Sequence, residues 1–198
     1  MAVDLEQYLY DRVKPIMEQW DEPGIYAISF FVYSNEAYVY HGVSNVSEFS
    51  IGYNTEEDCG SASAYSEERW NYAYWRQDMT HIIDPVDDDE GMKILFQWYK
   101  ENGIEGVGRE DWDTAYDETG AFIGKGPVGY YELLCAVSNV SKRLQTEGVA
   151  ERTAGRRVPI IVHELEYPWY VEEATQNANP HGEAAGFLKA VREGYPAS

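Results

Sequence analysis

Polar side chains that could do chemistry follow directly after one apolar run. Residues 158–162 (VPIIV) are apolar and mostly β-branched, which predicts a short strand buried on both faces. A strand end can hold polar groups rigidly, and a histidine beside carboxylates could form a general-base or ligand-binding site if these groups converge. The alternative is a core strand whose amphipathic end caps the fold. The candidate pocket residues are Arg69, His163, Glu164, Glu166, Tyr167, Asn179 and His181.

Known catalytic and metal motifs do not fit this segment. Residues 163–167 (HELEY) place Tyr167 where the HExxH zinc motif has its second histidine, and they follow a strand rather than lying on a helix. The acidic run 84–90 lacks the alternating ligands and the closing glutamate of a calcium loop. No GxSxG motif and no phosphate-binding glycine pattern occurs in its proper context. We therefore expect no metal and no cofactor, and the residues do not require an enzyme.

A second candidate site is an acidic and aromatic surface. The segment 67–75 surrounds Arg69 with tryptophan and tyrosine, side chains that suit protein interfaces because they bury a large area and keep a polar tip. The alternatives are a packed loop that braces the sheet and, for 84–90, a solvated turn before a helix. The candidate interface residues are Tyr72, Tyr74, Trp75, Asp87, Asp88 and Asp89.

The charge of the chain limits its partners. Its 198 residues hold 15 Lys and Arg against 35 Asp and Glu, a formal net charge of −20. Such a field repels nucleic acid and anionic membranes, and it attracts basic proteins. Simple solubility is the alternative explanation. A hydrophobic content of 44% is enough for a folded core.

The chain has neither a signal-peptide pattern nor an apolar stretch of membrane-spanning length, so we expect a cytoplasmic protein. Cys59 and Cys135 are far apart and form no metal-binding pair, and whether they form a disulfide is open. Cys135 lies in an apolar helical pattern and is predicted to be a buried thiol.

Hydrophobic periodicity predicts one α+β domain over residues 1–198, with an antiparallel or mixed sheet of about four to five strands packed with several helices. Residues 4–53 predict a helix at about 4–20 that is kinked or divided at Pro15, and a meander of strands at 25–33, 38–41 and 48–53. The middle, 54–157, predicts a helix start at 54–57, helices at 92–101 and 128–147, and loops at 103–129 and 151–157. Strand 158–163 is expected to join the meander, and residues 164–193 to form two C-terminal helices.

Several short segments resemble a bacterial family of unknown function, DUF4303. They are 25–33, 54–57 (NTEE), 69–75 (RWNYAYW) and 162–167 (VHELEY), in this order and at similar spacing. The family has an early strand, an NTEE-like element, an RW…W motif and a C-terminal helix. The resemblance implies neither an established activity nor catalytic residues.

Three hypotheses for the function follow. The first is a protein-binding module that occludes a basic partner, in concrete form an immunity-type protein against a nuclease toxin. The second is a small enzyme or ligand-binding protein with its pocket around residues 163–170. The third is an adaptor whose tyrosines form a homodimer face.

Overall fold

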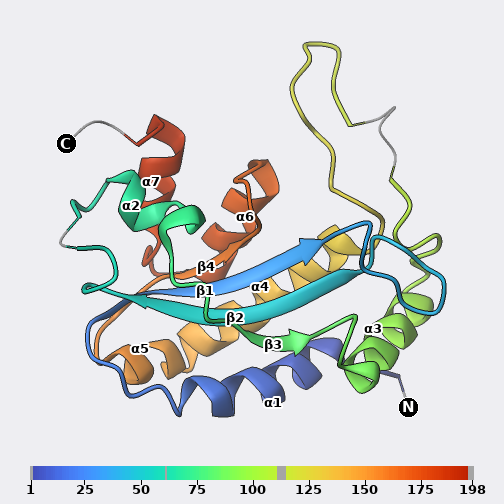
Figure 1. The fold of residues 1–198 in the computed structure, drawn as a ribbon, viewed down its shortest axis with the longest axis horizontal. Helices are drawn as coiled ribbons and strands as arrows, with labels where there is room; N and C mark the ends of the chain where they lie inside the picture. Colours follow the sequence, from blue (N-terminus) through green and yellow to red (C-terminus); the bar gives the residue numbers. More distant parts are fainter. Residues whose placement is uncertain (1, 61, 111–114, 196–198) are drawn as a thin grey trace.

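The computed structural model describes residues 2–60, 62–110 and 115–195. Within them a four-stranded mixed sheet lies between two groups of helices (Figure 1). The strands are β1 (Ile25–Ser34), β2 (Ser47–Thr55), β3 (Thr80–Ile83) and β4 (Ile160–His163), in the spatial order β3-β2-β1-β4. Strands β2 and β3 are antiparallel to their neighbours, whereas β4 runs parallel to β1. The predicted α+β class is confirmed, and strand 158–163 joins the N-terminal strands as expected.

The helices follow the predicted periodicity closely. They are α1 (Leu5–Met17), α2 (Glu67–Trp70), α3 (Asp89–Glu101), α4 (Tyr130–Thr146), α5 (Val149–Ala154), α6 (Trp169–Ala178) and α7 (Ala185–Glu193), with a short 3-10 helix η1 (Tyr72–Tyr74). Helix α1 begins at Asp4, whose side chain accepts a hydrogen bond from the Gln7 amide. It continues through Pro15 to Met17, because a proline in the last turn removes only one backbone bond.

Two hydrophobic cores lie on the two faces of the sheet. The larger one packs α1, α4 and neighbouring helices against Ile28, Phe30 and Val32 of β1. The smaller one packs α2, η1 and α7 against the other face, with Phe31 and Phe187 among its members. Successive strand residues point to opposite faces, so a strand covered on both sides is apolar along most of its length. This explains why β1 is hydrophobic from Ile25 to Tyr33 except at Ser29, a buried polar residue.

Four expectations for local structure are wrong. Residues 38–41 do not pair with β1, because the chain turns tightly at His41 and Gly42, which both have positive φ, and β1 pairs instead with β2. Asn54 and Thr55 end β2 rather than starting a helix. The expected loop 151–157 is helical up to Ala154. Cys135 is exposed on α4, whereas Cys59 is buried, and both thiols are free.

Between α3 and α4 the described residues contain neither helix nor strand, as predicted for 103–129; residues 111–114 of this loop lie outside the described part. Its second half rises above the sheet as a long projection (Figure 1, yellow). No helix among the described residues has both the length and the apolar character needed to cross a bilayer.

Candidate functional site

His163 lies at the end of β4 and is fully buried. Its Nε2 atom is 2.7 Å from Ser29 Oγ, and its Nδ1 atom is 2.9 Å from the carbonyl oxygen of Glu164. A carbonyl oxygen only accepts, so Nδ1 carries the proton and the Ser29 hydroxyl donates to Nε2. Burial lowers the pKa of His163 to about 4, which keeps the ring neutral at pH 7.

The Ser29–His163 pair has the pattern of a nucleophile, a base and an orienting group, but it has no access for a substrate. Aromatic rings of Phe31, Tyr72 and Trp75 surround the imidazole at centroid distances of 4.9–5.5 Å. Ser29 is itself buried between β2 and β4. A nucleophile must reach its substrate, so this pair is part of the smaller core.

Tyr167, four residues after the end of β4, is hydrogen-bonded to the aromatic segment 67–75. Its hydroxyl donates to the Trp70 carbonyl at 2.7 Å and accepts from the Tyr72 amide at 2.8 Å. Arg69 makes two hydrogen bonds to the Glu56 carboxylate, at 2.7 and 2.9 Å, and lies 4.1 Å from the centroid of the Tyr26 ring. The segment therefore braces the sheet, which was the alternative to a recognition surface.

Asn179 holds the outer edge of β4. Its side-chain amide donates to the carbonyls of Ile160 and Thr175, both at 2.7 Å, and its Oδ1 atom accepts from the Ile160 amide and the Gln145 side chain. Two residues further along β4, the Thr175 hydroxyl accepts from the Val162 amide and donates to its carbonyl. These side chains take the place of a fifth strand, and all four hydrogen-bonding positions of Asn179 are used.

The predicted pocket residues therefore do not converge. Asn179 is bound to Ile160, at the other end of β4 from His163. His181 is exposed and is hydrogen-bonded to Glu183, and Glu166 is also exposed. The Arg69 guanidinium forms an ion pair with the Glu56 carboxylate. Of the seven residues, Glu164 alone lines one of the cavities described below.

The predicted interface residues do not form one surface either. Tyr72 and Trp75 are buried, and Tyr74 is 55% exposed. Asp88 caps α3 through the Gly91 amide and pairs with Arg12, while Asp89 pairs with Lys93. Asp87 is exposed at the start of α3, and α3 and η1 lie at different ends of the sheet (Figure 1).

A cavity of about 220 Å³ lies beside Glu164, the residue that follows β4, and His163 is not among the residues that line it. Glu164 and Tyr170 line one wall, and Phe122 with the backbone around Gly124 lines another. The Tyr170 hydroxyl donates to the Glu164 carboxylate, and burial raises the pKa of that carboxyl. Lys125 also lines the cavity, and its ammonium lies 4.4 Å from the centroid of the Tyr131 ring. The cavity thus places a half-buried carboxylate within reach of a small ligand.

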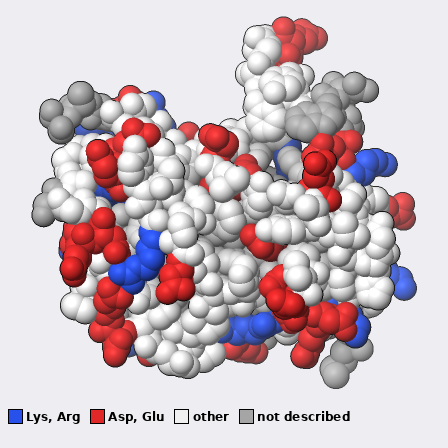
Figure 2. Space-filling view, in the orientation of Figure 1, with Lys and Arg blue, Asp and Glu red and all other residues white. Residues whose placement is uncertain are grey.

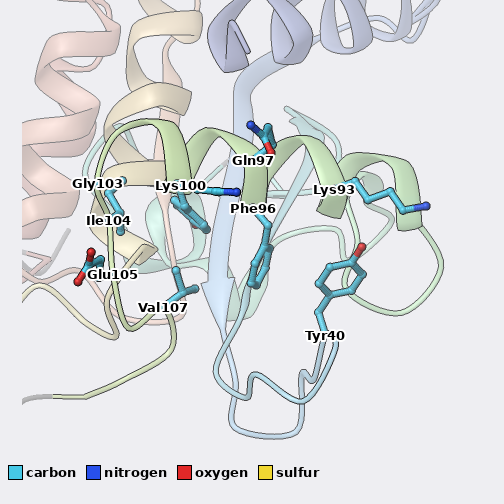
Figure 3. A pocket seen from close by; sticks show the side chains of 10 residues that line it. Tyr40, Lys93, Phe96, Gln97, Lys100, Gly103, Ile104, Glu105 and Val107 are labelled. Atoms are coloured by element: carbon cyan, nitrogen blue, oxygen red, sulfur yellow. The ribbon is translucent and has the colours of Figure 1, made fainter. Parts of the chain in front are cut away.

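A larger and more open groove of about 500 Å³ lies between α3 and the loop containing Tyr40 (Figure 3). Phe96, Val107 and Tyr40 form an apolar floor. The charged ends of Lys93 and Glu105 lie at opposite ends of the groove in Figure 3, so they do not converge on one point. A binding site needs a few polar groups directed at one ligand, and the groove shows no such arrangement among the described residues.

Metal ligands do not cluster in the part of the chain that the structure describes: no three His, Cys, Asp or Glu side chains lie together as a metal site requires. Comparison with family models found no match for the chain, and comparisons with curated proteins and with solved structures found none either. The resemblance to DUF4303 therefore stays a prediction.

The hypothesis of a pocket around residues 163–170 includes Tyr170 by its position, but Tyr170, Phe122 and Lys125 are not among the candidate pocket residues predicted from the sequence. Phe122 and Lys125 lie in a glycine-rich loop without periodicity, and Tyr170 comes seven residues after the end of β4, in the first turn of helix α6. One sequence signal could have indicated Phe122 and Lys125: they lie in a long glycine-rich loop that also contains aromatic residues. Long loops of this kind tend to be functional.

Proposed function

We propose that the protein is a binding module for a basic protein partner. The observation that carries this proposal is the pairing of its charges. Among the residues that the structure describes, eight of the 15 basic side chains form ion pairs with carboxylates of the same chain, so few of these cations are left to offset the remaining acids. The paired cations are Arg12, Arg69, Arg76, Lys93, Arg143, Arg156, Arg157 and Arg192.

The acidic excess is displayed on the surface. Figure 2 shows several groups of Asp and Glu side chains on a largely uncharged visible face, with basic side chains beside some of them. A surface of this sign speeds association with a positively charged protein and disfavours nucleic acid. An immunity-type role against a basic toxin is one form that this function would take.

The test is affinity capture on the immobilised protein at low salt, followed by purification of the retained partner and titration by calorimetry. We expect a basic partner whose Kd rises about tenfold or more when the salt concentration rises from about 50 to 300 mM, because exposed charges are then screened. A retained partner of neutral or acidic charge, or a Kd that does not change with salt, would contradict the proposal.

The cavity at Glu164 favours a second candidate function, the binding of a small ligand. Its volume of about 220 Å³ is below the roughly 300–1,000 Å³ of typical ligand pockets, so it suits a small amine or a single side chain. A thermal-shift screen of small amines tests this function: a stabilisation seen with wild type and lost in Glu164→Gln is expected, and equal shifts for both proteins would contradict it.

A further inference from the structure

The projection above the sheet is a hairpin formed by residues 115–124. Tyr116 and Phe122 form an antiparallel bridge, and the Ala115 carbonyl accepts hydrogen bonds from the amides of Ile123 and Gly124. The hairpin stands away from the sheet and the helices that cover it (Figure 1). Within the described part of the chain, its residues therefore have few neighbours to pack against.

The tip of the hairpin is held in one conformation. The Asp117 carboxylate accepts hydrogen bonds from the Thr119 amide, the Thr119 hydroxyl and the Ala121 amide. Gly120 has φ +81°, which a glycine adopts without strain. A preorganised turn loses little conformational entropy when it meets a partner, which favours binding.

The hairpin exposes apolar side chains. Tyr116 is 56% exposed, Ile123 49% and Phe122 36%, and the rings of Tyr116 and Phe122 meet edge to face at 5.5 Å. Eight large hydrophobic side chains are exposed in the described part of the chain, and three of them lie on these ten residues. A local cluster of this kind marks an interaction surface, whereas single exposed residues need no explanation.

The Glu164 cavity opens at the base of the same hairpin. Phe122 and Gly124 belong to the hairpin and line the cavity, together with the carboxylates of Glu110 and Glu164. The only cation of its lining in the described residues is Lys125, which is directed to the Tyr131 ring. The apolar surface of the hairpin and a negatively charged recess are therefore continuous.

We infer that the hairpin 115–124 and the cavity at its base form the docking site for the basic partner, and this inference rests on the proposed function. A Lys or Arg side chain of the partner enters the cavity and pairs with Glu164, while apolar residues of the partner cover Tyr116 and Ile123. A second copy of this chain is disfavoured as the occupant, because each copy carries a net charge of −20 and acidic Asp117 and Glu118 at the tip.

The test uses short random peptides displayed on phage, selected on the full chain at low salt. We expect the selected peptides to be enriched in Lys or Arg next to apolar residues. Synthetic copies of them are then titrated by fluorescence anisotropy against matched variants. Tyr116→Ser with Ile123→Ser changes the hairpin at constant charge, and Tyr74→Ser with Val86→Ser is the control for exposed residues elsewhere. Glu164→Gln is compared with Glu166→Gln, which removes the same charge from an exposed neighbour.

The expected result is a Kd about tenfold higher or more for the hairpin variant and for Glu164→Gln, and changes below about twofold for the two controls. Thermal unfolding of each variant checks that it is folded. Basic peptides that bind all variants alike would overturn the docking site and leave the proposed function standing. Selected peptides without an excess of Lys and Arg would overturn both proposals, and so would a failure to select any peptide.

Sedimentation measurements on the free protein test whether a second copy of this chain occupies the docking site. A monomer across the accessible concentration range is expected. A dimer that dissociates in the Tyr116→Ser, Ile123→Ser variant would overturn the inference, because the hairpin would then be covered by a second copy.

Discussion

His163 and Glu164 are neighbours in the chain, yet they belong to two regions with opposite properties. The side chain of His163 enters the smaller core, where Ser29 and a backbone carbonyl use both of its ring nitrogens. The side chain of Glu164 lines the cavity below the hairpin 115–124, where Tyr170 is its only hydrogen-bond partner in the described part of the chain. The first region is closed by its own hydrogen bonds, and the second has carboxylate capacity left for a ligand.

The comparison shows that the type of a polar residue does not decide its role. Histidine beside serine is a familiar catalytic combination, but here all its capacity is satisfied internally and water is excluded. The carboxylate of the next residue, Glu164, keeps free acceptor positions. Substitutions around His163 should therefore lower the stability of the protein, and substitutions around the Glu164 cavity should weaken binding. The predictions below test this division, starting with the largest expected effect.

Asn179→Ala should lower the free energy of unfolding by roughly 3–4 kcal/mol, because it leaves the buried amide and carbonyl of Ile160 without partners. Urea denaturation measures the change. Asn177→Ala, two residues earlier in α6, is the matched control; its side chain is partly exposed, and its loss should lower the free energy of unfolding by less than ~1 kcal/mol. Equal losses for the two variants would contradict the edge-holding role of Asn179.

The stability of the protein should fall by about 2 kcal/mol between pH 7 and pH 5 on account of His163. Its pKa is about 4 in the folded state and 6.5 in the reference state, so the unfolded chain binds more protons between these values. The free energy of unfolding therefore rises with pH through this window. Urea denaturation at both pH values, compared with His163→Gln, isolates the contribution; an identical pH dependence in the variant would show that His163 is not its source.

Tyr167→Phe should cost roughly 1–2 kcal/mol, because the Trp70 carbonyl and the Tyr72 amide both lose their partner. Tyr74→Phe makes the same change on an exposed ring and should alter the free energy of unfolding by less than ~0.5 kcal/mol. Thermal or urea unfolding of the pair gives the comparison. A cost at position 74 as large as at 167 would remove the distinction between buried and exposed tyrosines.

Tyr116→Ser combined with Ile123→Ser should change the free energy of unfolding by less than ~1 kcal/mol, since both side chains are about half exposed. The same variant is expected to lose binding to the selected peptides. A large loss of stability would show that these side chains pack within the protein itself and do not serve as an interface.

The sequence predicted most of the elements but few of their contacts. Long periodic helices such as α4 and the apolar strand β1 were found because each carries its own hydrophobic pattern. Strand β3 was not predicted: its four residues begin with Thr80 and His81, and only Ile82 and Ile83 are buried. Asn54 and Thr55 suit a helix cap, but pairing with β1 decides their conformation.

The site was less predictable because its geometry depends on residues distant in sequence. The residues around His163 come from β1, from η1 and from Tyr167. No local sequence pattern predicts that these segments lie together. Glu164 was named as a candidate, whereas the hairpin residues that share its cavity lie about 40 positions earlier. Composition correctly described the charge of the chain, but it could not say which cations were already paired.

The side-chain bonds along β4 also limit how the protein can associate with other chains. An open strand edge is a template for a further strand, and it is the usual start of domain swapping, sheet extension and fibril growth. At β4 that template is occupied by Asn179 and Thr175, so a partner could extend the sheet there only by first displacing α6. Two copies of the protein therefore cannot join their sheets through the β4 edge without that displacement, and a partner that binds there must recognise side chains instead of backbone.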